Sequence, residues 1–181
     1  MSSEVARYYD ANTRRFLLVG AGGGTYAIHR ELWAPGVSSA AEAVDQVNLL
    51  LADEIRGFAA HDTGSETEPA TPLRVLDLGC GVGGTVMRLA EQLSGASVTG
   101  VTISPKQVEI AERLAARRGL QARCRFVLGD FQDADLDEDH DVAVAIEAAV
   151  HADTPERFFG AASRALRRGG ILVLVDDFLT R

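Results

Sequence analysis

The stretch Val75-Leu-Asp-Leu-Gly-Cys-Gly-Val-Gly-Gly84 decides the fold of this chain. A short apolar run that includes Asp77 is followed by glycines at alternate positions, Gly79, Gly81 and Gly83, and a helical pattern then begins. This order predicts a strand, a tight loop and the start of a helix. Glycines at alternate positions remove the Cβ atoms that would keep a ligand away from the backbone, so the loop is shaped for close approach.

Two nucleotide-like cofactors compete for a loop of this kind. A dinucleotide loop has the spacing Gly-x-Gly-x-x-Gly, and its pyrophosphate prefers helix N-terminal amides with little negative charge beside them. Here the third glycine comes one residue early, and Asp77 lies two residues before the first glycine. A carboxylate there favours the ammonium group of S-adenosylmethionine over a pyrophosphate. A tight turn without any ligand remains the alternative.

Composition limits the class of protein and of partner. A length of 181 residues predicts about one domain, and a formal charge of −8 argues against nucleic acid, because phosphate binding needs a basic face. No apolar run is long enough to span a bilayer, and the N-terminus has no hydrophobic signal segment. Cys80 and Cys124 are too few for a disulfide framework and lack metal-site spacing. We therefore expect a cytoplasmic protein with a small-molecule partner and no metal site.

The first 71 residues predict a helical cap and linker, and residues 72–181 predict a separate cofactor-binding domain. Clustered glycines between Phe16 and Trp33 break any long helix and are more typical of a surface loop than of a lid. An amphipathic helix is expected from about Ser39 to Phe58, with an apolar stripe for core packing. The polar segment 61–72 is expected to be the linker.

Short apolar runs alternate with helical patterns from Leu73 onward. The predicted strands are 74–78, 97–101, 125–128, 142–146 and 171–175, and the predicted helices are about 84–93, 105–118 and 155–167. This alternation predicts an α/β fold with a doubly wound, Rossmann-like parallel sheet. Ligands of such sheets bind at the carboxyl ends of the strands, so the residues that end each strand are the candidate site.

The second strand ends in Thr102, and Ser104 and Gln107 follow. Ser104 and Gln107 with Pro105 between them form a capping box, which accounts for both residues without a ligand as well as a cofactor site does. Thr102 lies where nucleoside-binding sheets usually place an acid that holds the ribose hydroxyls. The Thr102 hydroxyl and the Gln107 amide are candidates to share that task.

The third strand ends in Asp130 and Phe131. The carboxylate can accept a hydrogen bond from the exocyclic amine of adenine, and the ring offers an aromatic edge. The alternative is a turn aspartate followed by a core phenylalanine. The acidic loop 133–141 that follows is expected to be solvated surface, because so many carboxylates cannot be buried without partners.

The fourth strand runs into Glu147, which emerges where a substrate would meet the cofactor, and His151 lies four residues further on. A carboxylate and an imidazole in these places can act as general base and relay. The alternatives are that Glu147 caps the following turn and that His151 packs against Trp33 or Phe158. Packing is favoured for His151 and the catalytic role for Glu147, because the end of a strand carries more functional weight.

Together these motifs resemble the class I S-adenosylmethionine-dependent methyltransferases. Residues 77–84 match the family's cofactor loop, residues 129–131 its adenine-binding strand end, and residues 166–173 its approach to the fifth strand. Residues 100–107 are similar to the Gly-Val-Thr-Leu-Ser-x-x-Gln motif of sterol, tocopherol and cyclopropane fatty acid methyltransferases, in which threonine and glutamine replace the ribose-binding acid. Residues 145–151 are similar to a substrate-facing segment of the sterol and terpenoid carbon methyltransferases.

The resemblance implies S-adenosylmethionine as cofactor and methyl transfer to a carbon of a hydrophobic, isoprenoid or other natural-product substrate. Its implied cofactor-binding residues are Tyr8, Asp77, Gly79, Gly81, Gly83, Thr102, Ser104, Gln107, Asp130, Phe131 and Ile146, and its implied catalytic residues are Tyr9, Glu147 and His151. Segment 20–29 is expected to close over the methionine end together with the two tyrosines. Oxygen or nitrogen methylation, or cofactor binding without catalysis, are the alternatives.

One departure from the family concerns the sheet. The family sheet has seven strands, whereas only five are expected here, which would leave a hydrophobic edge open to pairing. We expect either a further segment of the same protein or a second copy of the chain to complete the sheet.

Overall fold

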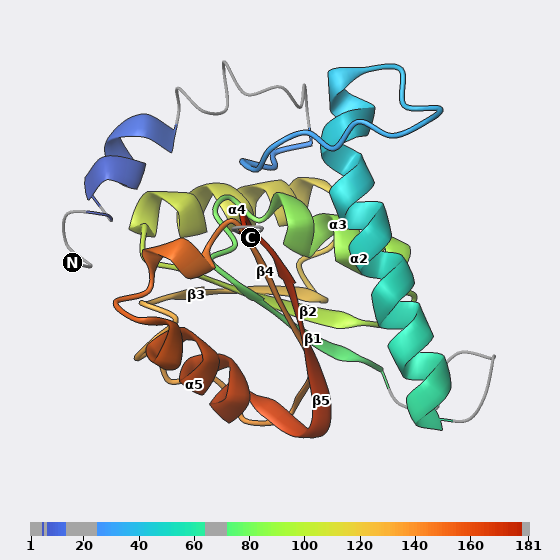
Figure 1. Ribbon diagram of the computed structural model, residues 1–181. Helices are drawn as coiled ribbons and strands as arrows, with labels where there is room; N and C mark the ends of the chain where they lie inside the picture. The colour runs from blue at the N-terminus through green and yellow to red at the C-terminus, as the bar shows by residue number, and fades with distance from the viewer. Residues whose placement is uncertain (1–4, 6, 14–24, 64–71, 179–181) are drawn as a thin grey trace.

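The computed structural model describes residues 5, 7–13, 25–63 and 72–178, and a parallel five-stranded sheet forms its centre (Figure 1). The strands are β1 Arg74–Leu78, β2 Ser97–Thr102, β3 Cys124–Leu128, β4 His140–Ile146 and β5 Leu166–Val175. Their order is β3-β2-β1-β4-β5, and every neighbouring pair is parallel. The expected α/β fold is confirmed. All five carboxyl ends lie at one edge, and the order of the strands reverses between β1 and β4.

Helices cover both faces of the sheet (Figure 1). Helices α2 Ala40–Thr63, α3 Gly84–Gln92 and α4 Pro105–Arg117 contribute to one hydrophobic cluster with the sheet, and α5 Pro155–Ala165 contributes to the other. Successive strand residues point to opposite faces, so Val75 belongs to the first cluster and Leu76 to the second. Burial on both faces explains why β4 contains the continuous apolar run 142–146 and why β1 is apolar apart from Arg74 and Asp77, rather than alternating.

Several predicted boundaries are wrong, among them the starts of β4 and β5, which begin at His140 and Leu166 instead of at residues 142 and 171. Helix α2 continues past Phe58 to Thr63, so the first residues of the expected linker are helical, and residues 64–71 lie outside the described part. Helix α5 ends at Ala165 instead of reaching residue 167, because Leu166 already pairs with His140 and begins β5. A register irregularity near the start of β4 separates this pair from the regular pairing that follows. A strand interrupted in this way has no simple signature in the sequence.

Helix α2 also bears on the expected division into a cap and a cofactor domain. Its residues Val47, Leu51 and Ile55 are buried in the same cluster as the sheet residues Val75 and Val98. The helix therefore contributes to the core of the sheet. The division at residue 71 stays a prediction.

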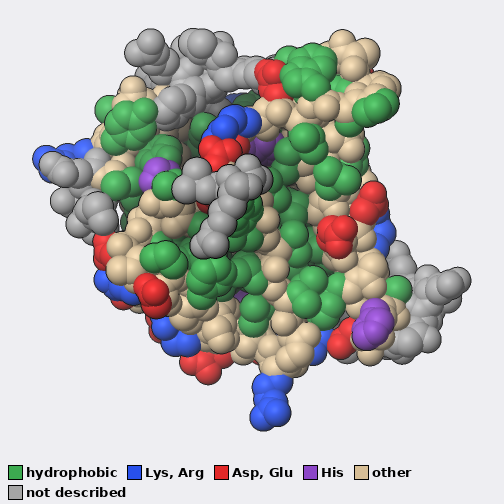
Figure 2. Space-filling view, in the orientation of Figure 1, with side chains coloured by type: hydrophobic (Ala, Val, Ile, Leu, Met, Phe, Trp, Pro, Cys, Tyr) green, Lys and Arg blue, Asp and Glu red, His purple; other side chains and the backbone are tan. Residues whose placement is uncertain are grey.

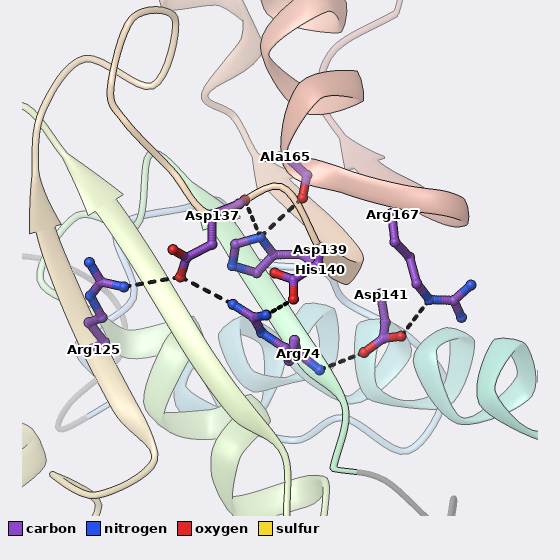
Figure 3. Close-up of polar contacts among 8 residues, drawn as sticks. All are labelled: Arg74, Arg125, Asp137, Asp139, His140, Asp141, Ala165 and Arg167. Carbon is purple, nitrogen blue, oxygen red and sulfur yellow. Dashed lines mark hydrogen bonds and ion pairs between the residues drawn. The ribbon is translucent and has the colours of Figure 1, made fainter.

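The acidic stretch 133–141 was expected to be solvated surface, but part of it is bound to other strands (Figure 3). The clearest case is Asp141, the second residue of β4. The side chain of Asp141 is only 19% exposed, and it accepts hydrogen bonds of 2.7 Å from the backbone N–H of Arg74 and of 2.7 Å from Nε of Arg167. Asp137 and Asp139 pair with the guanidinium of Arg74. The loop thus joins the amino ends of β1, β4 and β5, at the edge of the sheet opposite to the expected site.

Strands β3 and β5 are the outer strands of the sheet that the structure describes. In β5, residues 171–175 are only partly buried, as expected for a strand with one side open. Completion of the sheet by a further segment or by a second copy stays a prediction. Within residues 5–178 as far as they are described, no helix is long and apolar enough to cross a membrane.

Candidate active site

A cavity of about 690 Å³ opens at the carboxyl ends of the strands, where the strand order reverses. This is the place at which doubly wound sheets bind their ligands. Ten of the predicted site residues line the cavity: Tyr9, Gly79, Gly81, Thr102, Gln107, Asp130, Phe131, Ile146, Glu147 and His151. Four others, Tyr8, Asp77, Gly83 and Ser104, do not line it. Figure 2 shows this face of the molecule, with acidic and basic side chains together in a hollow among hydrophobic ones.

The glycine loop forms one wall of the cavity through two of its three predicted glycines. Gly79 has a φ of +90°, and a Cβ there would lie 2.6 Å from Cβ of Ala148, so only glycine fits. The backbone N–H groups of Gly79 and Cys80 donate to the carbonyl of Val101 at 3.0 and 2.9 Å, which fixes the loop on β2. Gly83 has another task, because a Cβ at this position would lie 2.5 Å from the ring of Phe126.

Asp77 is buried at the end of β1, with 3% of its surface exposed. Burial raises the pKa of its carboxyl to about 7, because the charged form loses its hydration. The charge of Asp77 also helps to raise the pKa of the buried Cys80 thiol in the glycine loop, although burial is the larger cause. A cation bound at the loop would favour ionisation of Asp77.

Thr102 and Gln107 form a buried pair at the end of β2. The Thr102 hydroxyl donates to Oε1 of Gln107 at 2.6 Å, and both residues line the cavity. Ser104 is fully buried instead, and its Oγ accepts from the backbone N–H of Gln107 at 3.2 Å as the N-cap of α4. For Ser104 the structure therefore supplies the capping role. The Gln107 side chain pairs with Thr102, which leaves its amide N–H₂ as a donor for a ligand.

Asp130 and Phe131 have the expected structural roles in a turn and in the core, and they also lie at the predicted site. Oδ1 of Asp130 accepts from the backbone N–H of Gln132 at 3.0 Å and from its side-chain amide at 3.1 Å, which is a turn role. The ring of Phe131 is buried and meets the ring of Phe158 edge-on, with 5.9 Å between centroids. Because both residues also line the cavity, turn and core packing hold them in place at the site.

Glu147 has an unusual backbone and joins three parts of the chain. Its φ is +50°, which is uncommon for a residue with a side chain, and strained residues of this kind cluster at functional sites. Its backbone N–H donates to the carbonyl of Val175 at 2.8 Å. Oε1 accepts from the backbone N–H of Arg30 at 3.0 Å and lies 3.4 Å from its Nε. Arg30 also pairs with Asp177, so this group links the segment before α2 to the ends of β4 and β5.

The predicted cap role of Glu147 is not what the structure shows. The short 3₁₀ helix η1, Ala149–His151, begins after Ala148 and has no side-chain cap. His151 at its end has Tyr9 as partner, with 2.9 Å between the phenol oxygen and Nε2 and with the two rings edge-on. Trp33 is 57% exposed and donates to Glu31 instead.

The N-terminal tyrosines lie in a short helix over the site. Residues 7–13 are helical, and Asp10 fastens them to the start of α4 by accepting from Ser104 and from Lys106. Tyr9 lines the cavity, whereas Tyr8 is 55% exposed and meets the ring of Tyr9 edge-on. Burial, followed by the charges of Tyr8 and Glu147, raises the pKa of the Tyr9 phenol.

The expected closing segment 20–29 is described only from residue 25. Ile28 lines the cavity, and a Cβ at Gly84 would lie 2.5 Å from the carbonyl oxygen of Tyr26. The segment therefore lies directly against the start of α3. Residues 20–24 lie outside the described part of the chain.

Sequence reasoning missed four charged residues of the described lining, Arg30, Asp153, Asp176 and Asp177. Of these, Asp153 precedes α5 and pairs with Arg157. Asp176 and Asp177 follow β5 directly, so the strand-end rule used for β1 to β4 would have found them. Arg30 carries no comparable signal, because it lies in a segment without regular secondary structure. Its place at the site depends on contacts with residues more than a hundred positions away.

Comparisons with known proteins agree with this geometry. The methyltransferase domain family matches residues 75–170. The sterol 24-C-methyltransferase ERG6A of Gibberella zeae is 37% identical over 124 residues, which are 68% of this chain and 31% of that protein. The ajmaline N-methyltransferase of Rauvolfia serpentina is 30% identical over 150 residues, 82% of this chain and 50% of that protein.

Among solved structures, the [4+2]-cyclase SpnF superimposes with a TM-score of 0.76 at 32% identity, over 96% of this chain and 59% of that chain. The chain thus spans about a third to a half of the length of the curated relatives it matches. The expected fold and the expected cofactor of the family, S-adenosylmethionine, are confirmed. With its glycine loop, strand order and matched residues 75–170, the chain belongs to the methyltransferase domain family.

Proposed function

We propose that this chain transfers a methyl group from S-adenosylmethionine to a small, largely hydrophobic natural-product acceptor. One observation carries the proposal. A single cavity brings together the loop glycines Gly79 and Gly81 on one side and Tyr9, Glu147 and His151 on the other. A cofactor at the loop would therefore face groups that can handle a proton.

The chemistry of the lining fits this cofactor better than a dinucleotide. Gly79 and Gly81 allow a ligand to approach the backbone closely. Carboxylates outnumber the one arginine, Arg30, among the described residues of the lining, which suits a ligand with a sulfonium and an ammonium group. A pyrophosphate would meet repulsion there. We propose that Thr102 and Gln107 hold the ribose and that Asp130 accepts from adenine.

The cofactor supplies a methyl group that is already electrophilic, so the protein mainly has to align the acceptor and exclude water. Phe158 and Leu174 supply apolar walls for this purpose. Glu147 is held by Arg30 and His151 by Tyr9, so the carboxylate and the imidazole are both fixed in position. We assign proton removal from the acceptor to Glu147, with His151 and Tyr9 as relay.

The same groups serve different acceptor atoms. At a carbon, the proton is removed after the new bond has formed, whereas at an oxygen it is removed as the bond forms and at a protonated nitrogen before it forms. An isoprenoid carbon is the acceptor that the sterol methyltransferase relatives support. A nitrogen is the acceptor that the ajmaline N-methyltransferase supports.

A second candidate is cyclisation of an apolar substrate in the same cavity without methyl transfer. It is favoured by the likeness to the cyclase SpnF, at 32% identity over 96% of this chain. In that case the bound cofactor would not be consumed.

Transfer of labelled methyl groups from S-adenosylmethionine to a panel of terpenoid, sterol and alkaloid acceptors tests the proposal. Product without label, in the presence of bound cofactor, would support cyclisation instead. Calorimetry with S-adenosylhomocysteine tests cofactor binding separately. Glu147→Gln is expected to keep that affinity while turnover falls by about two to four decades. Unchanged turnover would remove Glu147 from the mechanism.

A further inference from the structure

The charges around the cavity do not balance. Among the described residues of its lining, five are carboxylates and Arg30 is the one arginine or lysine. Arg30 forms ion pairs with Asp177 and Glu147, and the charges of these two residues and, to a smaller extent, of Asp176 raise the pKa of its guanidinium. Asp153 has its own partner, with 2.7 Å between its Oδ2 and Nη1 of Arg157. Two guanidinium groups therefore face five carboxylates, so the lining has a net negative charge.

The cofactor offsets only part of this charge. At neutral pH its sulfonium and ammonium groups are positive and its carboxylate is negative, so it brings one net positive charge. Negative charge remains at the other end of the cavity, beyond Glu147. An acceptor with a positive charge would be attracted there, and an acceptor with a phosphate would be repelled.

Asp176 is the carboxylate with an open position for such a ligand. It follows β5 directly and lines the cavity. Its Oδ1 accepts from the backbone N–H of Asp177 at 2.9 Å. Its Oδ2 is buried and has no hydrogen-bond partner among the described residues. A buried carboxylate oxygen without a donor costs free energy, and a donor on a ligand would remove that cost.

Apolar side chains line the same cavity. Leu174 lies on β5 just before Asp176, and the aromatic rings of Phe159 and Phe178 also line the cavity. Phe159 is 52% exposed and Phe178 is 67% exposed, so apolar surface extends from the cavity to the outside. This combination suits a ligand with a large apolar body and one positive head group.

We propose that the acceptor is an apolar amine, bound as its ammonium ion against Asp176 with its apolar body along Leu174, Phe159 and Phe178. The proposal names the substrate class of the proposed methyltransferase and rests on that function. It also assigns a selectivity: the same carboxylates exclude phosphorylated acceptors. The charge that Asp176 recognises is present on the acceptor before any reaction. Where the same nitrogen is methylated, its ammonium ion first gives a proton to Glu147, because only the free lone pair can attack the methyl group.

Geranylamine, geraniol and geranyl diphosphate are matched probes, because they share one isoprenoid chain and differ in the charge of the head group. Their binding is measured by calorimetry near neutral pH, with the chain saturated with S-adenosylhomocysteine and again without it. Geranylamine is expected to bind at least about tenfold more tightly than geraniol, and geranyl diphosphate is expected not to bind. Equal binding of amine and alcohol, or tighter binding of the diphosphate, overturns the proposal.

Asp176→Asn removes the charge at nearly constant volume and is expected to abolish the preference for the amine over the alcohol. Asp153→Asn is the matched control: it removes another carboxylate of the lining, one that Arg157 already pairs, and the preference should persist. If Asp176→Asn still prefers the amine over the alcohol, the proposal is contradicted. Asp176→Ser replaces that variant if circular dichroism shows it unfolded.

Failure of the function and failure of the inference give different results. A wild-type chain that does not bind S-adenosylhomocysteine counts against the proposed function. The head-group preference measured without this ligand still decides the role of Asp176. A chain that binds S-adenosylhomocysteine but shows no preference for the amine counts against the inference alone.

Discussion

Replacing Asp77 by asparagine should stabilise the protein, and the size of the effect should depend on pH. The pKa of the buried carboxyl is about 7, whereas an aspartate in an unfolded chain has a pKa near 3.9. Because the folded-state pKa is the higher one, the native state keeps a proton that the unfolded state has lost. Stability from this group is complete below about pH 4 and declines as the pH rises towards 7.

The difference between the two pKa values sets the magnitude. About three pKa units correspond to roughly 4 kcal/mol, an upper bound because buried sites relax when they ionise. Asparagine keeps the shape and carries no charge at any pH, so it avoids this loss. We expect Asp77→Asn to differ little from the wild type near pH 4 and to be more stable by a few kcal/mol above pH 7.

Urea denaturation of both proteins at a series of pH values measures this difference. Asp135→Asn is the control, because Asp135 is exposed and its replacement should have no effect that grows with pH. A stability difference between Asp77→Asn and wild type that is independent of pH would refute the reasoning, and so would a variant that is less stable above pH 7.

The ionisation of Asp77 should also appear in the pH dependence of ligand binding. The ammonium group of S-adenosylhomocysteine favours the charged form of Asp77, so its binding releases a proton below about pH 7. The affinity of the wild type should therefore rise with pH up to about 7 and then level off. In Asp77→Asn the affinity should be lower, and this pH dependence should be absent.

Two further substitutions separate the shape of the site from its chemistry. Gly79→Ala places a Cβ 2.6 Å from that of Ala148 at a φ of +90°, so we expect a loss of about 1–3 kcal/mol in stability and weaker S-adenosylhomocysteine binding, measured by thermal unfolding and calorimetry. Ser104→Ala removes the cap of α4 and the hydroxyl that donates to Asp10, and should cost at least about 1 kcal/mol in stability. Because Lys106 still holds Asp10, the affinity for S-adenosylhomocysteine should stay the same. A large loss of affinity for S-adenosylhomocysteine in Ser104→Ala would indicate that Ser104 takes part in cofactor binding.

The regular part of the fold was predictable because each signal was local. The strand Arg74–Leu78 was predicted with its observed bounds, since a doubly buried strand is apolar and a glycine loop ends it. The start of α4 followed from Ser104 and Pro105 for the same reason. Errors arose where a distant residue decides the boundary, as His140 does when it pairs with Leu166 and shortens α5.

Most of the candidate site could be predicted for a similar reason, whereas the place of Arg30 in its acceptor half could not. Thr102, Asp130 and Glu147 each end or follow a strand, and parallel strands bring such residues together. Arg30 belongs to no strand or helix. Its contacts with Glu147 and Asp177 depend on how residues 25–39 fold back over the sheet, which no periodicity encodes.

The Arg30 contacts explain how the acceptor half can be negative and still hold its shape. Without Arg30, Glu147 and Asp177 would repel each other across the ends of β4 and β5. One guanidinium offsets one of the two charges and connects both strands to the segment before α2. The charge that remains is available to a ligand, and Asp176 supplies the oxygen at which the ligand would bind. An arginine that neutralised every carboxylate would give the same rigidity but no preference for a cationic acceptor.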